Sequence, residues 1–269
     1  MECKGLYTAL VTPFNEDTTL DREGLAALVR QQCKAGVDAI VVLGTTGESA
    51  TIEPDERIAV IKIALENSTV PIWVGTGANS TRKAIEQTLE AQRLGAAGAL
   101  IVSPYYNRPT QEGLYQHFKA IHDATRIPIM LYNNPGRCGV NLLPETVLRL
   151  AALERIYAIK EASGNLSQMS ELLGKAPANF AVLSGDDAMA LPAVILGASG
   201  LVSVLSNLHP EEVKAYVDHC LAHRIREARA AHHRWAPELR ALFAETNPII
   251  VKRKMNLMGL PAGPCRAPL

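Results

Sequence analysis

Short apolar runs alternate with longer amphipathic runs along the chain. The apolar runs have the length of buried strands, and the amphipathic runs have the spacing of helices that bury one face. Eight units of a strand followed by a helix can be counted before residue 224. We expect strands at 6–14, 39–43, 72–74, 100–102, 129–132, 158–161, 181–183 and 201–205, and helices at 21–35, from 54 on, at 81–94, 111–124, 144–153, 166–175, 188–196, 210–223, 226–244 and 248–258.

This order favours one fold class. Repeated strand–helix units without a Gly/Ser linker are typical of a parallel sheet, and eight of them fit a closed α/β barrel of the (β/α)8 or TIM type. The alternative is an open, doubly wound sheet, which would leave two edge strands to cover. We expect residues 1–224 to form the barrel with the active site, and residues 225–269 a short C-terminal helical extension. The tail from 259 is too rich in proline and glycine to continue a helix.

Composition narrows the class of partner. Hydrophobic residues make up 48% of the 269, enough for a large core, and 27 basic residues balance 27 acidic ones. A chain without a basic surface is a poor candidate for binding nucleic acid or an anionic membrane. The five cysteines are scattered and the histidines do not cluster, which favours a reducing cytosol and no metal site. No apolar run approaches the roughly 20 residues that span a bilayer. We expect a soluble, unprocessed, cytoplasmic protein that acts on a small molecule.

The segment 157–165 places one lysine inside a predicted buried strand. Strand alternation puts Ala158 and Lys160 on one face, and Ile159 and Glu161 on the other. A buried lysine loses the hydration of its charged form, which favours the neutral, nucleophilic amine that Schiff-base chemistry needs. A structural lysine with a solvated tip at a strand end fits the same pattern, and by itself the pattern favours it.

Other strand ends carry polar groups as well, and in a barrel the carboxyl ends of all the strands meet at one face. The glycines and hydroxyls of 44–49 could bind a small anion through backbone N–H groups, or form an ordinary turn. Tyr132 shares a layer with Lys160 if the adjacent strands are in register. The planar fork of Arg137 suits a carboxylate, although an arginine near a turn is usually solvated.

Three further features have simple explanations. The segment 75–77 only weakly suggests a dinucleotide loop, because the third glycine is replaced by Ser80. Tyr105 and Tyr106 fit packing or interface aromatics. We interpret 232–233, a histidine pair in a charged helical run, as solvated surface.

Five motifs in this order resemble the dihydrodipicolinate synthases, a family of pyruvate-dependent class I aldolases. The resemblance extends from about residue 6 to 260, and it reverses the preference for a structural Lys160. The motifs are Gly44-Thr45-Thr46-Gly47-Glu48-Ser49, Tyr105-Tyr106-Asn107-Arg108-Pro109, Tyr132-Asn133-x-Pro135-x-Arg137-x-Gly139, Lys160-Glu161-Ala162-Ser163-Gly164-Asn165 and Ser184-Gly185-Asp186-Asp187.

The resemblance implies a Schiff-base condensation of pyruvate with L-aspartate 4-semialdehyde to 4-hydroxy-tetrahydrodipicolinate, a step of lysine and diaminopimelate biosynthesis. It implies that Lys160 forms the imine, and that Thr45, Tyr132 and Tyr106 form a proton relay, with Tyr106 reaching in from a neighbouring subunit. It further implies a homodimer or homotetramer, and no metal or organic cofactor.

The same match implies the residues that bind substrate. Thr46 would hold the pyruvate carboxylate together with Thr45, and Arg137 would bind the carboxylate of the semialdehyde. Gly185 and Val202 would line the pocket near the imine.

The sequence also departs from the family pattern. Lysine-inhibited members use histidines and a glutamate in an allosteric pocket at the dimer interface, where this chain has cations that would repel an ammonium group. We therefore predict weak or absent inhibition by lysine. The chain also ends about one helix earlier than is usual for the family, which leaves dimer and tetramer open. The degenerate allosteric positions are Pro54, Arg57 and Lys83, with Ser49, Ala50, Asn79 and Tyr105 unchanged.

Two alternatives to this function stay open. N-acetylneuraminate lyase and the keto-deoxy sugar acid aldolases share the lysine, the tyrosine and the glycine loop, but Arg137 favours a short carboxylated aldehyde. The chain could also be a noncatalytic barrel that binds a keto acid.

Overall fold

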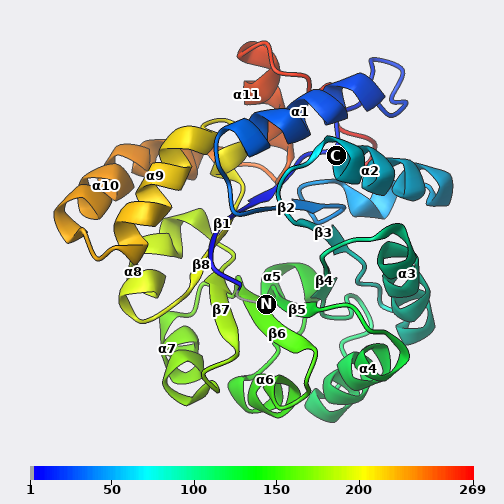
Figure 1. Ribbon diagram of the computed structural model, residues 1–269, viewed down its shortest axis with the longest axis vertical. Coiled ribbons are helices and arrows are strands. Elements are labelled where there is room, and N and C mark those ends of the chain that lie inside the picture. Colours follow the sequence, from blue (N-terminus) through cyan, green and yellow to red (C-terminus); the bar gives the residue numbers. More distant parts are fainter. Residues whose placement is uncertain (1–2) are drawn as a thin grey trace.

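Eight parallel strands close into a barrel in the computed structural model, which describes residues 3–269 (Figure 1). Each strand pairs with the next in the chain, and β1 pairs with β8 to close the ring. The (β/α)8 class is therefore confirmed, and the open doubly wound sheet is wrong. The strands are β1 (Gly5–Ala9), β2 (Ala39–Val42), β3 (Ile72–Gly75), β4 (Gly98–Val102), β5 (Ile129–Asn133), β6 (Ile156–Glu161), β7 (Ala181–Ser184) and β8 (Gly200–Ser203).

Helices cover the outside of the barrel, and several begin at a residue whose side chain accepts a hydrogen bond from the first turn. Asp21 accepts from Gly24 N at 2.8 Å, and Asn165 accepts from Gln168 N at 3.0 Å. The helices are α1 (Arg22–Lys34), α2 (Pro54–Asn67), α3 (Thr81–Leu94), α4 (Gln111–Ala124), α5 (Pro135–Cys138), α6 (Pro144–Ala151), α7 (Leu166–Lys175), α8 (Ala190–Ile195), α9 (Pro210–Leu221), α10 (Ile225–Leu242) and α11 (Ile249–Leu257), with 3-10 turns η1 (Ser49–Thr51), η2 (Asp187–Met189) and η3 (Leu205–Asn207).

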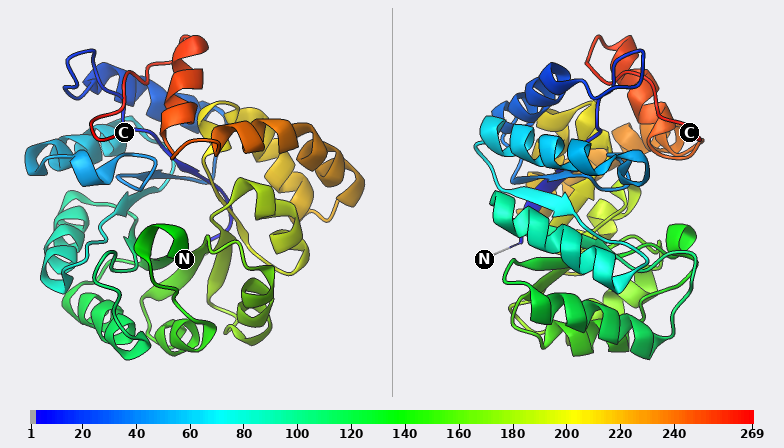
Figure 2. Two further views of the ribbon diagram at one scale, coloured as in Figure 1. Left: turned by 180° about the vertical axis from the view of Figure 1, so that it is seen from behind. Right: turned by 90° about the vertical axis from the view of Figure 1, so that its right-hand side faces the viewer.

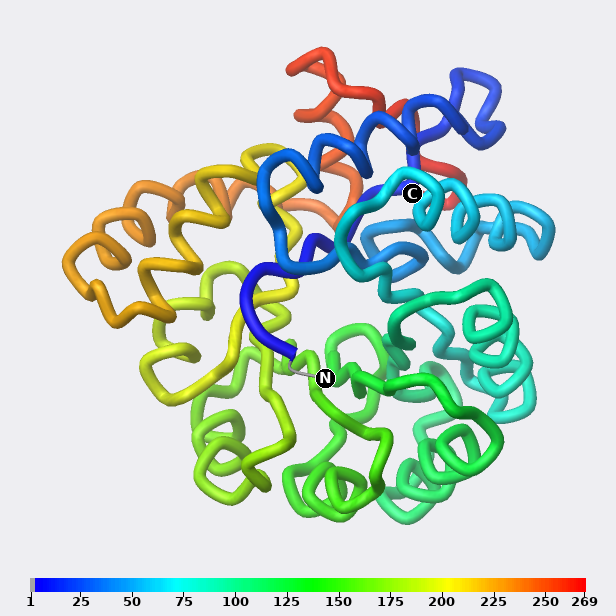
Figure 3. Tube along the Cα trace, viewed as in Figure 1, coloured from blue at the N-terminus to red at the C-terminus, as the bar shows by residue number. Residues whose placement is uncertain are grey.

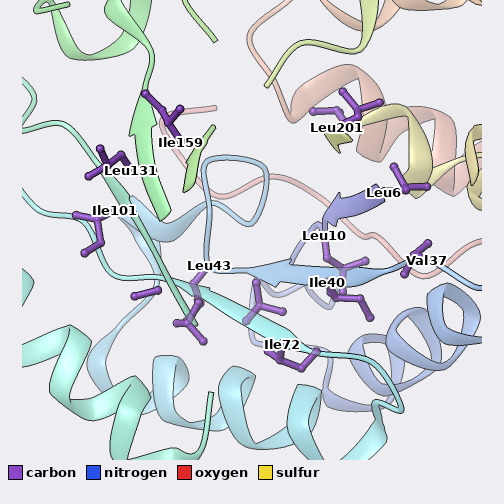
Figure 4. Packing of buried hydrophobic residues seen from close by; sticks show 14 of the residues in the cluster. Leu6, Leu10, Val37, Ile40, Leu43, Ile72, Ile101, Leu131, Ile159 and Leu201 are labelled. Carbon is purple, nitrogen blue, oxygen red and sulfur yellow. The ribbon is translucent and has the colours of Figure 1, made fainter. Parts of the chain in front are cut away.

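The core has two layers, because successive strand residues point to opposite faces. Outward-facing residues such as Ile40, Leu131 and Ile159 pack between the strands and the helices (Figure 4). Inward-facing residues such as Trp73 and Ala158 fill the barrel itself. The interior is thus packed with side chains.

The structure corrects three predicted elements in particular, and other boundaries, such as the starts of β4 and β6, differ by two residues. The first strand ends at Ala9 rather than at residue 14, because the chain there leaves the sheet and Phe14 forms an isolated antiparallel bridge with Leu20. The last strand ends at Ser203, and η3 follows it. The helix predicted at 188–196 begins as η2 and becomes α-helical only at Ala190.

The last two helices lie beyond the eight repeats. α10 packs against α8 and α9, and α11 contacts α10 and η3. Both lie toward the same end of the barrel as α5, which follows β5 (Figure 2). The tail after α11 runs back to the loop between β1 and α1 and to η1 (Figure 3), where Arg266 donates to the carbonyl oxygens of Thr18 and Thr51. In residues 3–269 no helix is both long enough and apolar enough to cross a membrane.

Candidate active site

Lys160 lies where the sequence pattern places it, near the carboxyl end of β6 and facing the barrel interior. Lys160 is 5% exposed, and Tyr132 is its register partner on β5. The Lys160 Nζ atom lies 4.3 Å from the centroid of the Tyr132 ring. The expected common layer of the two residues is confirmed, and it puts a phenol directly beside the amine.

Tyr132 is held by polar neighbours although it is buried. Its hydroxyl accepts a hydrogen bond of 3.1 Å from Asn134 Nδ2. Burial by itself raises the pKa of the Tyr132 phenol, but the charge of Lys160 and hydrogen bonds with Asn134 and Thr45 outweigh it, with a smaller contribution from Arg137. The pKa therefore lies below its ordinary value. A phenol in this state can both give and accept a proton beside the amine.

The two predicted anion sites are joined by one residue that sequence reasoning missed. Asn247, between α10 and α11, donates from Nδ2 to Thr46 Oγ1 at 2.9 Å. The backbone carbonyl oxygen of Asn247 accepts a hydrogen bond from Arg137 Nη2, also at 2.9 Å. No local pattern could have identified it, because the contact with Thr46 spans 201 residues of sequence.

A buried ion pair holds the loop that follows β2. Lys252 Nζ and Glu48 Oε1 lie 2.8 Å apart, and both side chains are 1% exposed. Lys252 also donates to the carbonyl oxygens of Thr12 and Pro264. Burial lowers the pKa of the Lys252 ammonium, while Glu48 opposes that change. The Thr45-Thr46 segment is thus anchored to α11.

Gly185 is placed directly against the lysine. A Cβ atom built on Gly185 would lie 2.9 Å from Lys160 Cγ and 2.7 Å from Ala162 Cβ, both too close for a real contact. Val202 is fully buried in the barrel interior, in the same cluster as Tyr132. These two predicted pocket residues therefore lie beside the reactive layer, and glycine is required at 185 for space.

A cavity of about 810 Å³ opens at this face of the barrel. Thr45, Tyr132 and Arg137 line it together with Asn247. It continues outward to six of the seven predicted allosteric positions, whereas Asn79 is exposed beside it. The six are Ser49, Ala50, Pro54, Arg57, Lys83 and Tyr105.

Arg57 is the buried cation of this outer part. Its Nη2 donates to Gly75 O at 3.2 Å, and its Nε lies 3.8 Å from a Glu90 carboxylate oxygen. Burial lowers the pKa of the Arg57 guanidinium, and Glu90 partly opposes this. Lys83, the second cation of this region, also faces the cavity.

A second cavity, of about 420 Å³, touches the residues that pack on the lysine. Ala162 and Gly185 line it together with His232 of α10. The His232 ring is half-buried, and its Nδ1 lies 3.1 Å from the Tyr216 hydroxyl. The interpretation of 232–233 as solvated surface is therefore wrong for His232, because Tyr216 and the cavity enclose it, while His233 is exposed.

Tyr106 is the one predicted catalytic residue that the chain does not bring to its own site. It is 90% exposed, has a φ of 75°, and lines neither cavity. Residues 3–269 contain no group of three or more metal-ligating side chains, and the five cysteines are free thiols.

The fold and the site have the features of a class I aldolase, the class of enzymes that use a lysine near the carboxyl ends of barrel strands to form an imine with a carbonyl substrate. Comparison with known proteins makes this specific. The chain belongs to the dihydrodipicolinate synthetase family, whose model matches residues 2–269. The lyase assignment is thereby confirmed.

Individual relatives agree along the whole chain. The 4-hydroxy-tetrahydrodipicolinate synthase of Geotalea daltonii is 49% identical over 268 residues, which are 99% of this chain and 92% of the relative. The crystal structure of dihydrodipicolinate synthase from Aquifex aeolicus is 41% identical, with a TM-score of 0.97 and coverage of 99% and 92%. A Cyanidioschyzon merolae enzyme, crystallised with lysine bound, is 40% identical, with a TM-score of 0.96 and the same coverage.

Proposed function

We propose that the chain condenses pyruvate with L-aspartate 4-semialdehyde to give 4-hydroxy-tetrahydrodipicolinate. The observation that carries this proposal is the buried Lys160 with Tyr132 paired beside it in register. The family and the names of the relatives favour this reaction over the sugar-acid aldolases and over a noncatalytic barrel.

The first half of the reaction uses the lysine. The neutral Lys160 amine attacks the ketone carbon of pyruvate, and the carbinolamine oxygen leaves as water after it is protonated. The resulting iminium withdraws electrons, so a methyl proton can be lost to give an enamine. Tyr132 is the group placed to carry these protons, because its ring lies 4.3 Å from the amine and its pKa is below the ordinary value.

The second half joins the two substrates. The enamine carbon attacks the aldehyde carbon of the semialdehyde, forming the new C–C bond. The amino group of the semialdehyde then displaces Lys160 at the imine carbon, which closes the ring and regenerates the free lysine. No step needs an oxidant, a metal or an organic cofactor.

Two anion sites orient the substrates in this proposal. Thr45 and Thr46 bind the pyruvate carboxylate, and Arg137 binds the carboxylate of the semialdehyde. Asn247 supports the assignment, because it contacts Thr46 and Arg137 at once and so fixes the spacing between the two sites. Gly185 and Val202 shape the space around the imine.

Assembly and location complete the proposal. Tyr106 joins the relay from a neighbouring subunit of a homodimer or homotetramer, which agrees with its 90% exposure. We further propose that residues 1–224 act as the catalytic barrel, that residues 225–269 act as a helical extension, and that the enzyme works in the cytoplasm.

Borohydride reduction in the presence of pyruvate is the decisive test. We expect a covalent adduct that peptide mass spectrometry places on Lys160, and none in Lys160→Ala. Absence of an adduct in the folded wild-type protein would refute the proposal that the chain is a Schiff-base enzyme. Steady-state assays with the semialdehyde, N-acetylneuraminate and keto-deoxy sugar acids then identify the second substrate, and the proposal fails if a sugar acid is turned over faster.

A further inference from the structure

A second polar pair lies directly behind the reactive pair. Asn133 and Glu161 follow Tyr132 and Lys160 in sequence and are themselves register partners across β5 and β6. Because strand side chains alternate, the reactive pair faces the barrel interior and Asn133 and Glu161 face the helices. Both outer residues are fully buried, at 0% and 1% exposure.

The hydrogen bonds around Glu161 require a carboxylate. Asn133 Nδ2 donates to both carboxylate oxygens at 3.3 and 3.0 Å, Ser163 N donates to Oε1 at 2.7 Å, and Gln168 Nε2 donates to Oε2 at 3.2 Å. The orientation of Asn133 is fixed, because its Oδ1 accepts from Leu142 N at 3.0 Å. Every neighbour is therefore a donor, which only an acceptor on both oxygens satisfies.

No cation takes part in this arrangement. Within residues 3–269, the hydrogen-bond partners of the Glu161 carboxylate are two side-chain amides and one backbone N–H. A buried carboxylate held by amides alone is uncommon and costly, since an ion pair or exposure to water would normally offset its burial. Uncharged side chains would fill this space at a lower free-energy cost than a carboxylate. The charge of Glu161 therefore has a role other than stabilising the fold.

The outer pair connects to both loops that complete the site. The bond from Leu142 N to Asn133 closes the loop that carries α5 and Arg137. The bonds from Ser163 and Gln168 to Glu161 fix the turn between β6 and α7. Asn141 links the two sides, because its amide bonds both Asn133 and Gln168.

We infer that Glu161 and Asn133 are positioning residues, and that the charged Glu161 carboxylate locks the ends of β5 and β6 so that Lys160 and Tyr132 keep their relative geometry through the reaction. This inference rests on the proposed function. Thr45 and Thr46, the proposed pyruvate carboxylate site, lie in the loop after β2 and not at the ends of β5 and β6. The Glu161 carboxylate should therefore affect proton transfer at the imine more than the binding of pyruvate.

Glu161→Gln tests the charge at nearly constant shape. The NH2 group of the new amide would face Asn133 Nδ2, which is also a donor. A buried N–H group would then lack an acceptor, which loosens the strand ends. Since displacements of about 1 Å can cost roughly a hundredfold in rate, we expect kcat to fall at least tenfold. The KM for pyruvate should stay within about twofold, because the carboxylate cradle is untouched.

A double variant reverses the polarity of the pair. In Asn133→Asp/Glu161→Gln the carboxylate moves to β5 and still accepts from Leu142 N, while the amides of Asn141 and Gln168 can rotate to suit it. We expect kcat to recover to within about threefold of wild type. Glu171→Gln, the same change at an exposed position of α7, is the matched control and should leave kcat unchanged.

The outcomes separate the inference from a general loss of structure. A wild-type kcat in Glu161→Gln, a kcat loss matched by an equal loss in pyruvate affinity, or a folded double variant that stays slow would each overturn it. If the single variant does not fold, the double variant alone decides, by its kcat relative to wild type. Failure of the proposed function is recognised separately, because wild-type enzyme would then give no borohydride adduct.

Discussion

Gly185→Ala is the smallest change that should disable the site. Gly185 follows β7 and donates from its backbone N–H to Glu161 O at 2.7 Å, so the backbone there cannot retreat freely. The added methyl group would lie 2.9 and 3.0 Å from Lys160 Cγ and Cε, and 2.7 Å from Ala162 Cβ. Something must move, and the flexible lysine chain is the easier of the two to displace.

The magnitude follows from these contacts. Carbon atoms at van der Waals contact are about 3.5–4.0 Å apart, so Lys160 must shift by roughly 0.5–1 Å. Misplacement of a reacting group by about 1 Å costs up to a hundredfold in rate. Overpacking of this kind costs about 1–3 kcal/mol of stability, which a large barrel can tolerate. We therefore expect a folded protein in which imine formation and kcat are slowed by about 30- to 100-fold.

The assay is the rate of borohydride-trapped adduct formation at saturating pyruvate, together with kcat for the condensation. Gly174→Ala is the matched control, because Gly174 lies on α7 and a Cβ atom there meets nothing within 4 Å. It should leave both rates unchanged. A Gly185→Ala enzyme that forms the adduct at the wild-type rate would refute the reasoning that Gly185 is required for space beside Lys160.

Three other predictions concern separate parts of the molecule. Tyr132→Phe removes the proton-transfer hydroxyl and should lower kcat by about 100-fold or more while the adduct with pyruvate still forms under borohydride; an unchanged kcat would exclude the relay. Lys252→Met leaves its carboxylate partner buried without a cation and should lower the free energy of unfolding by about 3–5 kcal/mol in urea titrations, and a loss below 1 kcal/mol would contradict the buried pair. Because Arg57 and Lys83 face the outer cavity, lysine should inhibit weakly or not at all; inhibition at submillimolar lysine that disappears on substitution of Asn79 would show otherwise.

The sequence was sufficient for features that depend on local periodicity. The bounds of α4 and α7 agree with those predicted, because Thr110 and Asn165 accept hydrogen bonds from the first turn and mark each start. Strand alternation alone put Lys160 and Glu161 on opposite faces of the strand, and this is confirmed, with Ala158 in the barrel interior and Ile159 between strands and helices. The extent of β1 was overestimated because apolar residues continue past Ala9, and periodicity does not distinguish a strand from a buried loop.

Contacts between distant segments could not be predicted in the same way. Asn247 lies between two predicted helices and Lys252 lies within the second, and nothing near either residue in sequence indicates its partner. Their roles follow from the packing of α10 and α11 over the carboxyl ends of the strands, which brings them to the loop after β2. Likewise, the amide partners of Glu161 became identifiable only once the register of β5 and β6 was known.

The Glu48–Lys252 ion pair has a consequence for the order in which the protein matures. The loop with Glu48 is synthesised early, but the cation that neutralises it is synthesised 204 residues later. Until then the carboxylate must remain in water, because burying it alone would be too costly. The loop with Thr45 and Thr46, the proposed pyruvate site, therefore cannot reach its final packing until Lys252 has been synthesised, whereas Lys160 is synthesised well before that.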